Sequence, residues 1–164
     1  MGWTGWGRFT ALGLLVGALA GCGILAPDGD GELRRLRRAE ALWMEHGPSH
    51  YRVTVERLCF CPVIAARITV EDGAITGVEF PEAEDPLPNE EWWREYVLSY
   101  YLPVDQVFPY LEEVLSRDPY SFEAQYRPSD GLPLEVSVDV MRNAVDDEWS
   151  LRYRDLEPLT GGSG

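Results

Sequence analysis

The alternation of apolar and polar residues predicts strands in two separate parts of the chain. Residues 50–58 alternate along their length, as expected for a strand with one buried face. Residues 66–80 predict a hairpin, because two alternating segments flank Asp72-Gly73, a favoured two-residue turn. Three more alternating segments follow, at residues 121–127, 132–140 and 148–156. In the second of these, we expect Leu134, Val136, Val138 and Val140 to share one inward face.

Two other segments show the spacing of an amphipathic helix. Residues 32–46 carry an apolar stripe, with Asp30 as the expected N-cap and a Gly-Pro pair that ends the helix. Residues 104–117 show a second stripe, and we expect Pro109 to be tolerated there within the first helical turn.

The order of these elements predicts an α+β fold. Since hairpins can join all the strands, we expect an antiparallel sheet of about six strands with two main helices on one face. The pattern also suggests two helix–three-strand halves, at residues 32–80 and 104–157. Residues 32–157 would then form a single domain, followed by a flexible tail at 158–164.

A stretch rich in acidic and aromatic residues separates the two halves. Residues 81–91 predict a loop, because prolines and dense acids prevent packing. Residues 92–102 predict a short helix or an irregular segment that covers the edge of the sheet. Such aromatic residues usually cover the hydrophobic core, and contact with a ligand is the alternative. The residues concerned are Trp92, Trp93, Tyr96, Tyr100 and Tyr101.

The start of the chain has the pattern of an exported protein. Residues 1–21 contain Arg8 and then an apolar run that is too short to span a bilayer, as in a signal peptide. This run ends in a tetrapeptide that resembles the bacterial lipobox, formed by Leu19, Ala20, Gly21 and Cys22. The resemblance implies cleavage before Cys22 and acylation of that cysteine, with palmitate or a similar chain. The alternative is an ordinary cleaved signal with a chance cysteine.

Charge and location restrict the partners. The net charge is −14, and removal of residues 1–21 takes away one arginine and no acid, so the remaining chain is more acidic still. This acidity argues against binding to nucleic acid. Residues 22–31 read as a short tether, so we expect a domain held close to a membrane, in the periplasm or elsewhere on the extracytoplasmic side of the cell envelope. An arginine cluster early in the first helix would touch lipid headgroups or pair with acids of the domain.

Cys59 and Cys61 are the two cysteines that remain when Cys22 is acylated. Outside the cytoplasm such a pair is expected to be oxidised. Residues i and i+2 of an extended strand lie near the limit of disulfide range, so closure needs a bend. The interpretations are a local disulfide, two buried thiols or a thiol–disulfide switch. Redox enzymes usually place a C-x-x-C pair at a helix N-terminus, and that setting is missing from this sequence pattern.

No metal, cofactor or catalytic residue is predicted. The two histidines, His46 and His50, are separated by a Gly-Pro pair and do not share a helix face. The acidic clusters lack the offsets of a calcium loop, and common catalytic motifs are absent from the sequence after residue 21.

Several motifs together resemble an uncharacterised family of bacterial lipoproteins, a domain of unknown function with a Cys-Phe-Cys motif. They are the segment around Trp43, YRVTVERLCFCP, ITVEDG, YRPSDGLP and the acidic DDE turn, and the resemblance covers residues 40–157. It implies an extracytoplasmic α+β domain and brings no activity or ligand with it. Residues 81–102 depart from the family pattern.

We therefore expect a lipid-anchored domain that is not an enzyme and that binds an envelope protein or a small ligand. The alternatives are a thiol–disulfide redox partner that uses Cys59 and Cys61, and a purely structural spacer of the envelope.

Overall fold

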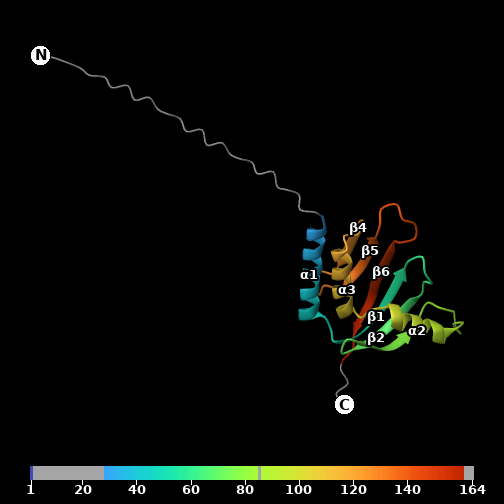
Figure 1. The fold of residues 1–164 in the computed structure, drawn as a ribbon. Helices are drawn as coiled ribbons and strands as arrows, with labels where there is room; N and C mark the ends of the chain where they lie inside the picture. Colours follow the sequence, from blue (N-terminus) through green and yellow to red (C-terminus); the bar gives the residue numbers. More distant parts are fainter. Residues whose placement is uncertain (2–27, 85, 161–164) are drawn as a thin grey trace.

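The computed structural model describes residues 1, 28–84 and 86–160, which form a sheet with helices packed on it (Figure 1). The sheet has six antiparallel strands in the order β3-β2-β1-β6-β5-β4. The helices are α1 (Asp28–His46), α2 (Glu90–Tyr100) and α3 (Val104–Ser116). The strands are β1 (His50–Leu58), β2 (Ala65–Glu71), β3 (Ala74–Glu79), β4 (Ser121–Tyr126), β5 (Pro133–Asp139) and β6 (Trp149–Pro158). The predicted α+β fold is confirmed, with α2 as a third helix.

Two three-stranded units build the sheet. Strands β1, β2 and β3 follow α1, whereas β4, β5 and β6 follow α3, and hairpins connect neighbours within each unit. The units join where β1 pairs with β6, in a register that sets Val55 opposite Tyr153. The division into two helix–three-strand halves is therefore confirmed, and β1 and β6 form the centre of a continuous sheet.

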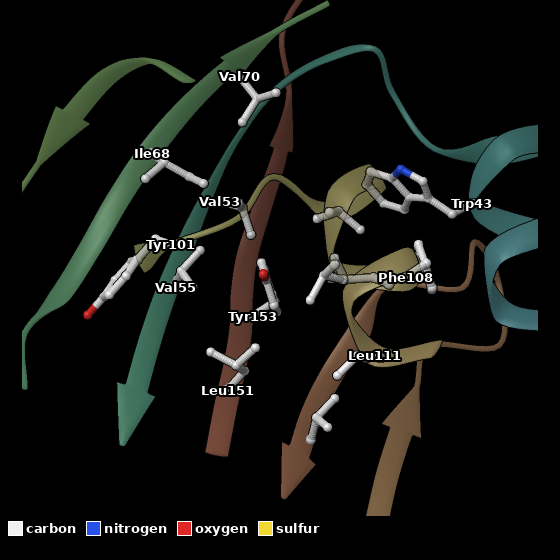
Figure 2. Packing of buried hydrophobic residues seen from close by; sticks show 14 of the residues in the cluster. Trp43, Val53, Val55, Ile68, Val70, Tyr101, Phe108, Leu111, Leu151 and Tyr153 are labelled. Carbon is white, nitrogen blue, oxygen red and sulfur yellow. The ribbon is translucent and has the colours of Figure 1, made fainter. Parts of the chain in front are cut away.

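Helices α1 and α3 cover one face of the sheet, and the core lies between them and the strands (Figure 1). Trp43 of α1 and Phe108 and Leu111 of α3 point toward the sheet (Figure 2). The buried residues that the strands contribute are Tyr51, Val53, Val55, Ile68, Val70, Val136, Val138, Leu151 and Tyr153. Full burial of each large apolar side chain stabilises the fold by about 1.5–3 kcal/mol before entropy is counted.

Two buried tyrosines attach the segment between α2 and α3 to the sheet. The hydroxyl of Tyr153 donates to the carbonyl of Leu102 at 2.9 Å, and the hydroxyl of Tyr51 accepts from the N–H of Val104 at 2.9 Å. Burial raises the pKa of both phenols above the ordinary value, so both stay neutral. Because an unpaired polar group is costly inside the core, these bonds hold the connection across the inner face.

The turn between β4 and β5 packs closely against α1. Gly131 has a φ of 77°, and its N–H donates to the carbonyl of Arg127 at 2.8 Å. Asp130 accepts from the Arg127 guanidinium and from the N–H of Leu132 at 3.1 Å. Burial alone would raise the pKa of the Asp130 carboxyl, but these hydrogen bonds outweigh it and lower the pKa below its usual value. A Cβ on Gly131 would lie 2.0 Å from the carbonyl oxygen of Ala39, so only glycine fits.

The predicted hairpin turn between β2 and β3 is confirmed. Asp72 and Gly73 have φ values of 49° and 75°, as the primed two-residue turns of hairpins require. A Cβ on Gly73 would meet only the Asp105 carboxylate, with its nearest oxygen at 2.9 Å. This turn therefore needs a left-handed backbone conformation, but unlike Gly131 it does not pack against another backbone segment.

The helix ends differ from the expectation in two places. Helix α1 begins at Asp28, so Asp30 lies inside the helix and is not its N-cap. Pro109 is the sixth residue of α3 and lies in the second turn, where it cannot donate to the carbonyl of Asp105. Helix α3 continues through Pro109 because Val107, Phe108 and Leu111 of its apolar face are buried in the core.

The inward face predicted for β5 is only partly correct. Val136 and Val138 are buried, but Leu134 and Val140 keep 38% and 42% of their surface exposed. A register shift between Gln125 and Tyr126 of β4 sets Pro133 opposite Tyr126, so Pro133 is buried in place of Leu134. Val140 follows the last residue of the strand.

Candidate functional site

Among the described residues, no helix lies on the second face of the sheet, and charged side chains there pair across the strands (Figure 1). Arg152 of β6 lies 3.0 Å from Glu135 of β5 and 3.8 Å from Glu56 of β1. Arg67 of β2 lies 2.8 Å from Glu157 of β6. Arg152 therefore joins neighbouring strands, where opposite charges stabilise a sheet modestly, whereas Arg67 reaches across β1 to Glu157. Acids of the same face therefore balance the charges of Arg67 and Arg152.

One end of this open face is hollowed into a cleft of about 550 Å³. Strand register explains its floor, because Glu123, Ser137, Ser150 and Leu58 lie directly opposite one another on β4, β5, β6 and β1. Its walls come from the loop after β1 and the loop before β6. The other lining residues are Cys59, Phe60, Ser121, Val138, Asp139, Asp146, Glu148 and Trp149.

The chemistry of the cleft is acidic and hydroxylated. Its lining holds four carboxylates, from Glu123, Asp139, Asp146 and Glu148, and no basic residue occurs among the described residues that line it. One carboxylate oxygen of Asp139 is buried and has no hydrogen-bond partner among the described residues. Carboxylates and hydroxyls accept hydrogen bonds, so the cleft suits a ligand with a positive charge and several N–H donors.

The Cys59–Cys61 pair lies at the rim of this cleft. Strand β1 ends at Leu58, and the chain bends so that the two Cα atoms are 5.1 Å apart with the sulfurs placed as a disulfide. The expected bend is therefore present. Both cysteines are half-buried, and Phe60 between them has 83% of its surface exposed. The pair neighbours a strand end and not a helix N-terminus, which would stabilise a thiolate.

Helix α2 contains most of the predicted aromatic segment and lies beside the edge strand β3, apart from α1 and α3 (Figure 1). The rings of Trp92 and Tyr96 stack, with centroids 5.5 Å apart. Trp92 and Tyr100 are about half exposed, and Trp93 and Tyr96 are half-buried. Ligand contact by these four residues remains a prediction.

Tyr101 differs from the other four aromatics. It keeps only 2% of its surface exposed, and its hydroxyl donates to the carbonyl of Ile64. Burial raises its pKa to about 12. Tyr101 is therefore a core residue and not part of an exposed aromatic surface.

The histidines lie far from the cysteines. His50 begins β1 and contacts Asp72 at 3.0 Å, whereas Cys59 follows the opposite end of the same strand. In residues 28–84 and 86–160, no group of three or more histidine, cysteine or acidic side chains is arranged to hold a metal ion. Within the same ranges, no helix is long and apolar enough to cross a membrane. The predicted signal peptide, lipobox and lipidated Cys22 lie outside the described residues.

Sequence reasoning missed the cleft, although part of its signal was present. Ser121 and Glu123 of β4 alternate with inward residues, and so do Ser137 and Asp139 of β5. Small hydroxylated residues at the outward positions of neighbouring strands mark an open, uncovered face. The register that brings them opposite Ser150 depends on tertiary pairing and could not be obtained from alternation alone.

Comparison with known proteins gives one relationship. Residues 35–158 match the model of a family of unknown function, DUF6174. Neither the curated proteins nor the solved structures contain a match to the chain. The match spans the domain from the second turn of α1 to the last residue of β6. This chain therefore belongs to the DUF6174 family.

Proposed function

We propose that this protein is a lipid-anchored, extracytoplasmic binding domain, not an enzyme, that holds a small, positively charged ligand in the cleft. The proposal of a positively charged ligand rests on Glu123, Ser137 and Ser150, which lie side by side on β4, β5 and β6. Three further carboxylates border them. Arg67 and Arg152 of the open face pair with acids outside the cleft, so these two arginines do not neutralise it. The proposal of a lipid anchor depends on the lipobox-like segment that ends at Cys22.

A binding role suits these side chains better than catalysis. Both histidines lie toward the far end of β1, so neither can act as a general base at the cleft. The serines in the cleft have no adjacent histidine to activate them as nucleophiles. What remains is a set of hydrogen-bond acceptors that can bind and orient a cation.

The double variant Glu123→Gln/Asp139→Asn tests this role with spermidine as the probe. The expected result is about a tenfold or greater loss of affinity in isothermal titration calorimetry, because each carboxylate can accept a charge-assisted hydrogen bond from an ammonium group. The double variant Glu45→Gln/Glu95→Gln removes the same charge from exposed positions on α1 and α2 and should retain the affinity. Equal losses in both variants would show only general attraction to an acidic protein, and the cleft assignment would be abandoned.

The position of the cysteine pair supports a second candidate function. Cys59 lines the cleft, and the exposed Phe60 next to it offers an apolar contact to another protein. Under this reading the protein is a thiol–disulfide redox partner that exchanges the Cys59–Cys61 bond.

Equilibration with glutathione or dithiothreitol buffers, followed by alkylation and mass measurement, would give the reduction potential of the pair. Structural disulfides of secreted proteins typically lie below about −300 mV, whereas redox proteins lie at about −270 to −120 mV. We expect a value in the structural range, since the pair lies between β1 and β2 and no helix of the described residues begins in that connection to stabilise a thiolate. A value within the redox range would favour the exchange reaction over simple binding.

A further inference from the structure

Exposed apolar side chains gather at one end of the domain. Phe60 lies in the loop after β1, and Met141 and Val145 lie in the loop before β6, with exposed fractions of 83%, 59% and 84%. These loops are neighbours, because Leu58 at the end of β1 pairs with Ser150 at the start of β6. Isolated exposed apolar residues are ordinary, but a group on adjacent loops indicates an interaction surface. We call Phe60, Met141 and Val145 the apolar loop end.

Helix α1 begins at this same end of the molecule. Its last residue, His46, is close in sequence to His50, which starts β1 at the opposite end. Since β1 runs from His50 toward the apolar loop end, α1 runs in the reverse direction. Figure 1 shows the start of α1 and the loop between β5 and β6 at the top of the molecule. The chain therefore enters the domain at the end where the exposed apolar residues lie.

The number of residues between Cys22 and α1 limits the distance between a lipid anchor and the start of the domain. Six residue steps separate Cys22 from Asp28, the first residue of α1. A fully extended chain covers about 3.3–3.6 Å per residue, so the reach is at most about 22 Å. If Cys22 is acylated in a bilayer, Asp28 is held within that distance of the lipid surface, and the end of the domain that carries Phe60, Met141 and Val145 lies on the side of the anchor.

We infer that the apolar loop end docks on the bilayer surface, with Phe60, Met141 and Val145 in the interfacial region. This inference rests on the proposed lipid anchor. Aromatic and aliphatic side chains lower their free energy when they leave water for this region, and the anchor supplies a high local concentration. The acidic domain favours an uncharged, zwitterionic surface over an anionic one. Docking would place the cleft, which Phe60 also borders, at the membrane surface.

Two methionines make the orientation measurable. Met141 belongs to the apolar loop end, whereas Met44 lies near the end of α1 at the opposite side of the domain with 76% of its surface exposed. The lipidated protein in phosphatidylcholine vesicles is compared with the mature Cys22→Ser chain added to the same vesicles. Oxidation by hydroxyl radicals, read by mass spectrometry, is expected to fall about fivefold at Met141 on lipidation and to change less than about twofold at Met44.

Matched variants separate docking from anchoring. In the lipidated Phe60→Ser/Val145→Ser protein, Met141 should oxidise as fast as in the unanchored chain, while co-flotation with vesicles persists. Leu134→Ser removes an exposed apolar side chain at the other end of β5 and should leave the protection of Met141 intact.

Three results would overturn the inference or its basis. Failure of the lipidated protein to float with vesicles would refute the anchor itself. Flotation with the same change in oxidation at Met141 and Met44 on lipidation would refute docking alone. Protection of Met141 that grows with protein concentration in the absence of vesicles would assign the apolar loop end to contact with a second copy.

Discussion

Replacement of Gly131 by alanine is expected to destabilise the domain by about 3 kcal/mol or more. The added methyl group would lie 2.0 Å from the carbonyl oxygen of Ala39 and 3.1 Å from the backbone nitrogen of Trp43. Both contacts are backbone atoms of α1, so the helix or the turn must move. The φ of 77° adds the strain of a left-handed conformation for a residue with a Cβ. Urea unfolding followed by circular dichroism would measure the loss.

Gly73→Ala is the control for this measurement. Gly73 has nearly the same φ, 75°, but its added methyl group would meet only the carboxylate of Asp105, which can rotate away. The expected cost is about 1 kcal/mol, the backbone strain alone. The difference between the two variants therefore reports the contact of the β4–β5 turn with α1. Equal costs would mean that α1 and this turn are not closely packed.

Substitution of Cys22 by serine is expected to move the protein from the membrane fraction to the soluble fraction. A serine hydroxyl cannot form the thioether through which a lipobox cysteine carries its diacylglycerol, so the acyl chains are lost. Two or three chains at about 0.8 kcal/mol per buried CH₂ give stable anchoring, and their loss should lower the bound fraction by several orders of magnitude. Fractionation of cells, with the intact mass of each fraction, would measure the effect.

The mass distinguishes the ways in which this prediction can fail. A Cys22→Ser chain that stays on the membrane with residues 1–21 attached is an uncut precursor held by its signal segment. A chain that has lost residues 1–21 and still stays bound would contradict anchoring by lipid. The double variant Cys59→Ser/Cys61→Ser is the matched control, because it removes the other two cysteines and should keep both the acyl mass and the membrane location.

The candidate sites show which features a local sequence pattern can predict and which it cannot. The bend at Cys59–Cys61 was predictable, because the geometry of an extended strand leaves the two cysteines too far apart. The cleft was not, since Glu123, Ser137 and Ser150 come from three strands whose register local alternation does not encode. The same limit applies to Tyr101, which the sequence pattern does not distinguish from Trp92, Trp93, Tyr96 and Tyr100. Its burial depends on the path of the chain across the inner face of the sheet.

The sequence by itself determined the elements and their grouping, because the period of apolar residues differs between strands and helices and acts within a few residues. It was sufficient for the six strands, the hairpin turn at Asp72-Gly73 and the α+β class. The tertiary structure decided what depends on distant partners, namely the pairing of β1 with β6 and the burial of Tyr101. It also brought the loops of Phe60 and Met141 to one end, next to the acidic cleft. Burial and register are set by contacts between segments about one hundred residues apart, and no local pattern carries that information.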